Sequence, residues 1–322
     1  MADGDLITSN TFEGANPTAD GFTIQEDGGT VTYDTGTFRS GASALQLTHA
    51  LDTGQLRCGT TYGAGQRRVA QRLYMRVSSL PSTGTVDIFR PASCNSEMYL
   101  SLSSAGVVTF YTDGDSTGTS IGTVTADDNW DVIEVETDGD TAAEIDHWAS
   151  LNGASASNIT DTASPNDLGS YTIGSYSQAA TSSWDIFFDD WIVYEGALAN
   201  LPAKTVQPAS SLSTSEPVVG TARVNFTVSN DGDVDSYTIR YKSGSGQSFS
   251  DETDGTQFAT ATATTPQASV TNVDLAALSA GTYTIGVFLE TVDGVFSAAA
   301  TDDVTISSAG VAGGFLLLDV GS

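Results

Sequence analysis

The sequence predicts an all-β protein that consists of two β-sandwich domains, and three observations support this prediction. Apolar and polar residues alternate with a period of two in many short segments, whereas no segment shows a convincing helical period. Gly, Asn and Asp residues that favour tight turns separate these segments. The chain has 322 residues, and a domain has about 100–200 residues. The length therefore fits two domains, each with its own core.

The expected strands of the first domain follow from this alternation. In segment 68–77, Val69, Leu73, Met75 and Val77 share one parity, and Arg68, Arg72 and Arg76 share the other. This pattern indicates a strand with one buried and one exposed face. The same pattern predicts strands at 98–102, 107–111, 132–136, 145–151 and 186–194. Turns are expected at 104–106, 113–115, 138–140 and 152–153.

Composition divides the chain into four parts. We expect a first domain at 1–196, a linker rich in Pro, Ser and Thr at 197–215, a second domain at 216–307 and a Gly-rich spacer with an apolar tip at 308–322. In the second domain, strands are expected at 222–229, 236–241, 281–291 and 303–306. The tip contains Phe315, Leu316, Leu317, Leu318 and Val320. Exposed apolar residues favour aggregation, so we expect this C-terminal anchor to pack on another subunit.

Charge excludes several partners. Asp and Glu number 40 against 11 Lys and Arg, which gives a formal net charge of −29. Nucleic acids and anionic membranes bind proteins through Lys and Arg, so neither is an expected partner. No apolar run approaches the about 20 residues that span a bilayer, which argues against membrane insertion. The acidic N-terminus carries no export signal, although a mature fragment would have lost one.

Five segments of the first domain resemble the concanavalin A-like (laminin-G-like) jelly-roll superfamily. They are Thr11-Phe12-Glu13-Gly14 and the segments 39–45, 130–135, 147–153 and 186–194. The resemblance implies a jelly-roll sandwich whose last strand pairs beside the first. It implies little about function, because one fold serves many functions.

The second domain resembles a fibronectin type III domain, a smaller sandwich of the immunoglobulin type. Segment 237–241 matches its central strand, and 280–283 with the preceding Leu275 and Leu278 match its tyrosine corner. Phe226 replaces the Trp that is usual in the family core. The resemblance implies a spacer or an interaction platform without chemistry of its own.

Catalysis is not expected. Segment 144–148 is similar to the strand of laminarinase-type endoglucanases that carries two catalytic carboxylates. Glu144 and Asp146 match that motif, but positions 148 and 149 are Trp and Ala. A retaining glycosidase needs both carboxylates, so we expect no enzyme. The two histidines, His49 and His147, are expected to be structural.

Glycan and metal binding remain open in the sequence. Trp148 shares the parity of Glu144 and Asp146 and is the best aromatic candidate for stacking on a sugar, although packing within the sandwich is the alternative. A Ca²⁺ site is an alternative to simple hairpin turns at four carboxylates, Asp113, Asp115, Asp138 and Asp140. Cys58 and Cys94 are either two separate thiols or one disulfide.

Arginines gather in the first domain. The group consists of Arg57, Arg67, Arg68, Arg72, Arg76 and Arg90. They either balance nearby carboxylates or dock on an acidic neighbouring subunit, as in a homo-oligomer.

These features together favour a non-enzymatic virion protein of a tailed phage, either capsid decoration or a tail or fibre component. Such a protein is made in the host cytoplasm, lies on the virion surface and contacts other virion subunits. Its jelly roll is expected to attach to surface glycans. The alternatives are a carbohydrate-binding module or adhesin of a secreted bacterial protein and, more remotely, a glycosidase.

Overall fold

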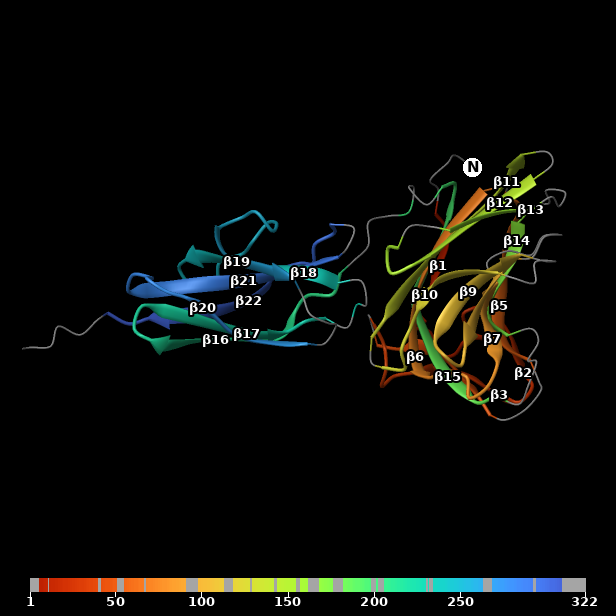
Figure 1. Cartoon of the computed structure of the whole chain (residues 1–322), viewed down its shortest axis with the longest axis horizontal. Coiled ribbons are helices and arrows are strands. Elements are labelled where there is room, and N and C mark those ends of the chain that lie inside the picture. The colour runs from red at the N-terminus through yellow and green to blue at the C-terminus, as the bar shows by residue number, and fades with distance from the viewer. Residues whose placement is uncertain are drawn as a thin grey trace, which may run out of the picture. The chain divides into compact units, whose positions relative to one another are not determined.

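The computed structural model of the chain describes residues 6–308 with internal gaps. The gaps are 11, 40–41, 51–54, 67, 91–97, 113–117, 128, 142–143, 155–156, 162–167, 176–181, 198–200, 202–205, 230, 232–233, 263–267 and 292–293. The chain forms two compact units (Figure 1). The first comprises Met1–Lys204 and Asn230–Asp233, and the second comprises Thr205–Ser229 and Val234–Ser322. All of the regular elements that the structure describes are β-strands, as the sequence predicts.

The first unit is a sandwich of two antiparallel sheets. The eight-stranded sheet has the order β13 (Ser157–Asp161), β12 (Glu144–Leu151), β11 (Asp131–Thr141), β6 (Arg68–Ser79), β15 (Trp184–Glu195), β4 (Ala44–His49) and β3 (Gly29–Asp34), with β1 (Leu6–Asn10) also paired to β15. The seven-stranded sheet has the order β10 (Thr119–Thr123), β9 (Val107–Thr112), β8 (Met98–Ser103), β7 (Thr85–Arg90), β14 (Leu168–Ser175), β5 (Leu56–Gln66) and β2 (Thr23–Glu26). The pairing of the first strand with the last confirms one expectation of the jelly-roll resemblance.

The core of the first unit lies between these sheets. It contains Val69, Leu73, Met75 and Val77, so the core face predicted for β6 is confirmed. The opposite face is not exposed as predicted, because Arg72 and Tyr74 on it are also buried. Leu100 and Phe110 contribute from the opposite sheet. Trp191 belongs to this core, and Trp130 is fully buried in a separate small cluster. Burial of these apolar side chains is the main force that holds the two sheets together.

The second unit is a smaller sandwich of three and four strands (Figure 1). One sheet has the order β16 (Ser210–Val218), β17 (Thr221–Thr227) and β20 (Ser269–Leu275). The other has the order β19 (Thr256–Thr262), β18 (Val234–Ser243), β21 (Gly281–Thr291) and β22 (Ala300–Ile306). Phe226, Ile239 and Ile285 meet in its core, and the Tyr283 hydroxyl donates a hydrogen bond to the carbonyl of Ser279 at 3.0 Å. That contact is the one expected of a tyrosine corner.

Two local expectations differ from the structure. The division between the two units falls within the expected linker 197–215, but β16 already begins at Ser210, and Val206 and Ala209 are buried in the second core. The expected turn at 138–140 is also absent, because β11 continues with an irregular register to Thr141. In both places the chain gains strand hydrogen bonds that the turn and linker residues did not suggest.

Part of the sequence interpretation concerns residues that the structure does not describe. The C-terminal anchor with Phe315, Leu316, Leu317, Leu318 and Val320 lies outside the described residues. Within residues 6–308 apart from the gaps, no helix is long and apolar enough to cross a membrane.

Candidate functional site

The glycan-binding residues predicted from the sequence belong to β12, near one edge of the eight-stranded sheet. Trp148 and Asp146 are half-buried and alternate with the buried residues Ile145, His147 and Ala149. They therefore lie on the face turned away from the core. The side chain of Glu144 lies outside the described residues.

Charged side chains on this face pair with one another. On the neighbouring strand β11, Glu136 lies opposite Trp148, and Asp138 lies opposite Asp146. The Arg68 guanidinium donates to Glu136 at 2.5 and 2.8 Å and reaches Asp138 at 3.4 Å. These contacts tie β6 to β11, and Asp146 in turn accepts a hydrogen bond from Thr160 of β13 at 2.5 Å.

The other two arginines of β6 also make contacts within the first unit. Arg72 pairs with Glu134 at 2.7 Å, and Arg76 lies over the ring of Phe187 at 5.7 Å. This arrangement favours internal charge balance, one of the two alternatives that the sequence left open. The role of Arg68, Arg72 and Arg76 in subunit docking stays a prediction.

The calcium candidates are only partly described. Asp113, Asp115 and the side chain of Asp140 lie outside the described residues, and Asp138 pairs with Arg68. Among the residues that the structure describes, no group of three or more His, Cys, Asp or Glu side chains could hold a metal ion.

The histidines and the described cysteine are buried in the first unit. His147 Nδ1 is 3.1 Å from the Thr137 hydroxyl, and His49 stacks on Trp184 with Nδ1 2.7 Å from the carbonyl oxygen of Ser182. Cys58 is a free thiol, and its burial raises its pKa well above the ordinary value. Cys94 lies outside the described residues. These groups therefore serve packing in the first unit.

A group of side chains that the sequence did not bring together lies on the outer face of the seven-stranded sheet. We call it the Tyr–Arg face. Each of its members alternates with core residues such as Cys58, Phe89, Leu100, Phe110 and Ile173, so each points away from the core. The face consists of Gln25, Arg57, Asp87, Arg90, Tyr99, Tyr111 and Thr172.

Strand register brings these residues together from six strands. Tyr99 lies directly opposite Tyr111, Arg57 opposite Gln25, and Arg90 opposite Thr172. The order β9-β8-β7-β14-β5-β2 therefore places two tyrosines at one side and Gln25 at the other, with the arginines between them.

The geometry of the Tyr–Arg face is that of an ordered polar and aromatic surface. The rings of Tyr99 and Tyr111 are stacked, with centroids 5.0 Å apart and planes 9° from parallel. The Arg90 guanidinium lies 5.0 Å from the Tyr99 ring and pairs with Asp87 at 2.9 Å. Arg57 donates from two nitrogens to the amide oxygen of Gln25 at 3.0 and 2.8 Å.

These contacts define what the face can do chemically. Aromatic rings offer flat apolar surface, whereas guanidinium, amide and carboxylate groups recognise hydroxyl and acidic groups. Because the side chains already hold one another in place, little conformational entropy is lost when a ligand binds.

Comparison with known proteins gives likenesses in structure only. No family model and no curated protein matches the sequence. The structure is similar to a cellulose-induced protein, Cip1, at 18% identity and a TM-score of 0.42, over 59% of this chain and 99% of that chain. It is also similar to a carbohydrate esterase of the Shiga toxin-encoding bacteriophage phi24B, at 13% identity and a TM-score of 0.45, over 60% and 99% of the two chains. A third likeness is to domain 4 of AbnA, an arabinanase from Geobacillus stearothermophilus in complex with arabinotriose, at 17% identity and a TM-score of 0.41, over 62% and 96%. Likenesses of this degree concern β-sandwich architecture and identify neither ligand nor activity.

Proposed function

We propose that the first unit is a glycan-binding module and that the Tyr–Arg face is its binding surface. The observation that carries the proposal is the stacked pair Tyr99–Tyr111, with Arg90 against Tyr99, on the face turned away from the core. Aromatic pairs in soluble proteins usually lie in cores or at interfaces, where they bury large areas. A partly exposed, ordered pair on a sheet face is suited to contact a ligand.

A saccharide complements both kinds of group on this face. The apolar C–H side of a sugar ring packs on a tyrosine ring, and its hydroxyls exchange hydrogen bonds with Arg57, Gln25 and Asp87. Sheet side chains repeat along and across strands, so a flat face of this kind suits an extended chain of sugars.

A glycan array followed by titration calorimetry on the best ligand tests this proposal. Tyr99→Ala and Tyr111→Ala are each expected to weaken binding about tenfold, which corresponds to about 1.4 kcal/mol. Trp148→Ala, on the opposite sheet, is the matched aromatic control and is expected to bind normally. If only Trp148→Ala lost binding, the glycan-binding site would be the one predicted from the sequence, at Glu144, Asp146 and Trp148, and not the Tyr–Arg face.

The module is proposed to be non-catalytic. The support is the Trp at position 148, where the glycosidase motif that resembles this strand requires a carboxylate. Incubation with the bound glycan should release no reducing ends. Release that disappeared in Glu144→Gln would establish the glycosidase alternative.

We also propose the wider context that the sequence favours, a display protein on the surface of a tailed-phage virion. In this proposal the second unit is a fibronectin type III-like spacer, which is supported by its three- and four-stranded sheets and by the Tyr283 corner. The partners of the whole protein are other virion subunits, and residues 315–320 form the anchor that attaches it to the particle. Mass spectrometry of purified particles tests the location, and a deletion of 315–320 that left the protein on the particles would contradict the anchor.

A further inference from the structure

A groove lies on the second unit, beside the outer face of its four-stranded sheet. One wall is the loop 244–255, which joins β18 to β19, and the other is the segment 298–303 at the start of β22. The groove has a volume of about 580 Å³. Small-molecule sites usually have volumes of about 300–1,000 Å³. Its size therefore suits a short ligand of a few rings.

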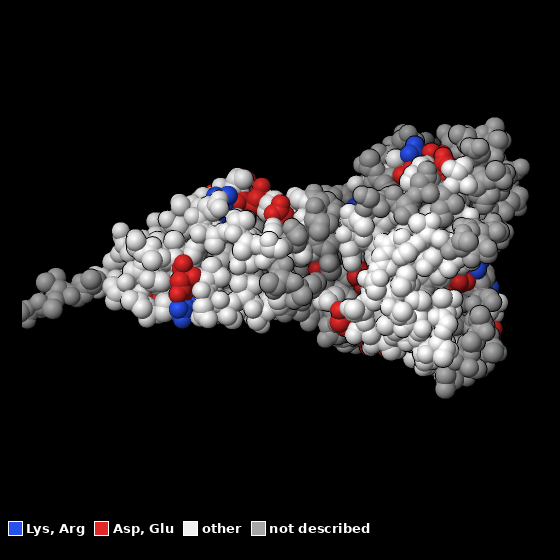
Figure 2. Space-filling model, in the orientation of Figure 1, with Lys and Arg blue, Asp and Glu red and all other residues white. Residues whose placement is uncertain are grey.

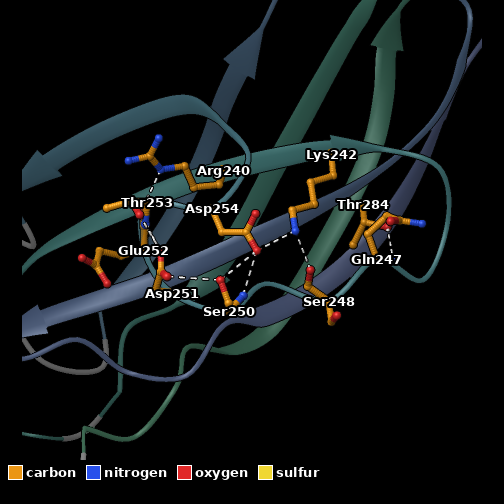
Figure 3. Close-up of polar contacts among 10 residues, drawn as sticks. All are labelled: Arg240, Lys242, Gln247, Ser248, Ser250, Asp251, Glu252, Thr253, Asp254 and Thr284. Atoms are coloured by element: carbon orange, nitrogen blue, oxygen red, sulfur yellow. Dashed lines mark hydrogen bonds and ion pairs between the residues drawn. The ribbon is translucent and has the colours of Figure 1, made fainter.

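Hydrogen bonds fix the loop wall of the groove (Figure 3). The ammonium of Lys242 donates to the carbonyl of Ser248 at 2.7 Å and to the carboxylate of Asp254 at 2.6 Å. The amide of Gln247 donates to the Thr284 hydroxyl at 3.0 Å, and the amide of Gly246 donates to Asp303. The wall is therefore ordered before any ligand arrives, which lowers the entropic cost of binding.

An aromatic residue completes this wall. Phe249 meets Phe288 edge to face, with ring centroids 6.0 Å apart. A side chain at Gly286 would collide with the Phe249 ring, since a Cβ there would lie 2.8 Å from it. Gly286 thus leaves the space that lets Phe249 lie against the sheet. Ala298 and Ala299 extend the apolar surface on the other side of the groove.

Two polar groups of the groove are not used by the protein. Thr301 lies opposite Gly286 on the outer face of the sheet, whereas Asp302 lies opposite the core residue Ile285, and its carboxylate accepts the amide and hydroxyl of Thr214 on the other sheet, both at 2.8 Å. Within the part of the chain that the structure describes, the Gln247 side-chain carbonyl and the Thr301 hydroxyl have no hydrogen-bond partner. The carbonyl accepts hydrogen bonds and the hydroxyl both accepts and donates them, so the groove fits a ligand that is rich in hydroxyl groups and has an apolar side.

We propose that this groove is a second saccharide site, which takes one or two sugar units of a neutral glycan. The hydroxyls of the sugar exchange hydrogen bonds with Gln247 and Thr301, and its C–H side packs on Phe249 and Ala298. A lysine- or arginine-rich peptide is the rival occupant, because the carboxylate of Asp303 lines the groove without a basic side chain among its lining residues. The saccharide is favoured because an amide and a hydroxyl stand beside this carboxylate, and both exchange hydrogen bonds with a sugar.

Titrations of the full-length protein that carries both Tyr99→Ala and Tyr111→Ala test the groove separately from the Tyr–Arg face. The probes are short neutral oligosaccharides from a glycan array and, separately, oligolysine. Thr301→Trp should fill the groove and weaken oligosaccharide binding at least about tenfold. Thr305→Trp is the matched control, since Thr305 is also exposed on the same face of β22 but lies outside the groove.

The outcomes are distinct. Oligosaccharide binding that survives in the double Tyr variant, is lost in Thr301→Trp and is kept in Thr305→Trp supports the proposal, whether or not the Tyr–Arg face binds glycans. Gln247→Ala, which removes the side-chain carbonyl from the groove, should weaken the same binding. Oligolysine binding that is lost in Thr301→Trp and in high salt would show that the groove binds a basic peptide and not a saccharide. Absence of oligosaccharide binding to the double Tyr variant overturns the proposal.

Discussion

Single side chains fix particular contacts in this protein, and Tyr283 is a clear case. Its hydroxyl binds the carbonyl of Ser279 just before β21, while its ring meets Tyr241 edge to face at 5.8 Å. Tyr283→Phe removes the hydrogen bond and keeps the ring, so the second unit should lose about 1 kcal/mol of unfolding free energy. Hydrogen exchange of the β21 amides measures the loss. Tyr241→Phe keeps the same ring contact and removes a hydroxyl that does not bind Ser279, so it is the control, and an equal loss there would show that the hydrogen bond to Ser279 is not the cause.

Asp189 is a residue of the same kind in the first unit. Its fully buried carboxylate accepts the backbone amides of Arg39 and Asp190, each at 2.8 Å. Asp189→Ala should cost the first unit about 3 kcal/mol, because these donors then remain buried beside the charge of Arg39. Urea denaturation followed by tryptophan fluorescence is a suitable measurement, since all four tryptophans lie before residue 192.

Asp185 provides the control for that experiment. It lies on the same strand, β15, but accepts hydrogen bonds from the side chains of Gln46 and Thr48. Asp185→Ala should cost less than about 1 kcal/mol. If the two variants were equally destabilised, burial of the Asp189 contacts would not be the cause.

At the scale of elements, the loop 244–255 is held by Lys242. The pKa of the Asp254 carboxyl is lowered to about 2, mainly by the hydrogen bond from Lys242. The hydrogen bond from the Ser250 amide also contributes to this lowering. The pKa of an unfolded Asp is about 3.9, so this contact stabilises the folded loop above that pH. The stabilisation is lost as the pH falls through the folded value of about 2.

Lys242→Met should therefore raise the pKa of Asp254 toward the unfolded value. Carboxyl chemical shifts in an NMR titration measure this change. Asp274 is the internal control, because its pKa is lowered by a hydrogen bond from Arg223, on a different sheet from Lys242. A pKa of Asp254 that stayed near 2 in the variant would assign the shift to Ser250 instead.

Strands with strong alternation were predictable from the sequence, and strands without it were not. β8, β9 and β21 follow the predicted segments closely, because each packs every second residue into a core. β16 reads as Ser, Thr and Glu with few apolar residues, and its burial pattern is mostly exposed. Such a strand forms because its partner β17 offers backbone hydrogen bonds, a long-range cause that local composition does not reveal.

Long-range strand pairing is also the reason why the candidate sites could not be fully predicted from the sequence. Alternation places Trp148, Tyr99 and Arg57 on outer faces, but it does not say which strands are neighbours. Tyr99 and Arg57 share a face only because β7 and β14 lie between β8 and β5. The groove likewise needs β22 beside β21 and the loop that follows β18, an arrangement fixed by tertiary pairing.

At the scale of the whole molecule, acidic residues far outnumber basic ones. The view in Figure 2 shows mainly uncharged surface with a few charged patches, and most basic patches adjoin acidic ones. The 11 basic residues cannot balance 40 acidic ones, so a net charge of −29 remains. Repulsion among these charges opposes folding and decreases when salt screens it.

Salt is therefore expected to stabilise the protein. The Tm should rise by several degrees between about 0.01 and 0.5 M NaCl, because the Debye length falls from about 30 Å to well below 10 Å over that range. Choline chloride should give a similar rise if screening is the cause, and a Tm that stayed constant or fell would contradict this account. CaCl₂ at the same ionic strength tests the calcium site predicted at Asp113, Asp115, Asp138 and Asp140. A larger rise than in NaCl supports a bound cation, whereas an equal rise means that Ca²⁺ acts by screening alone.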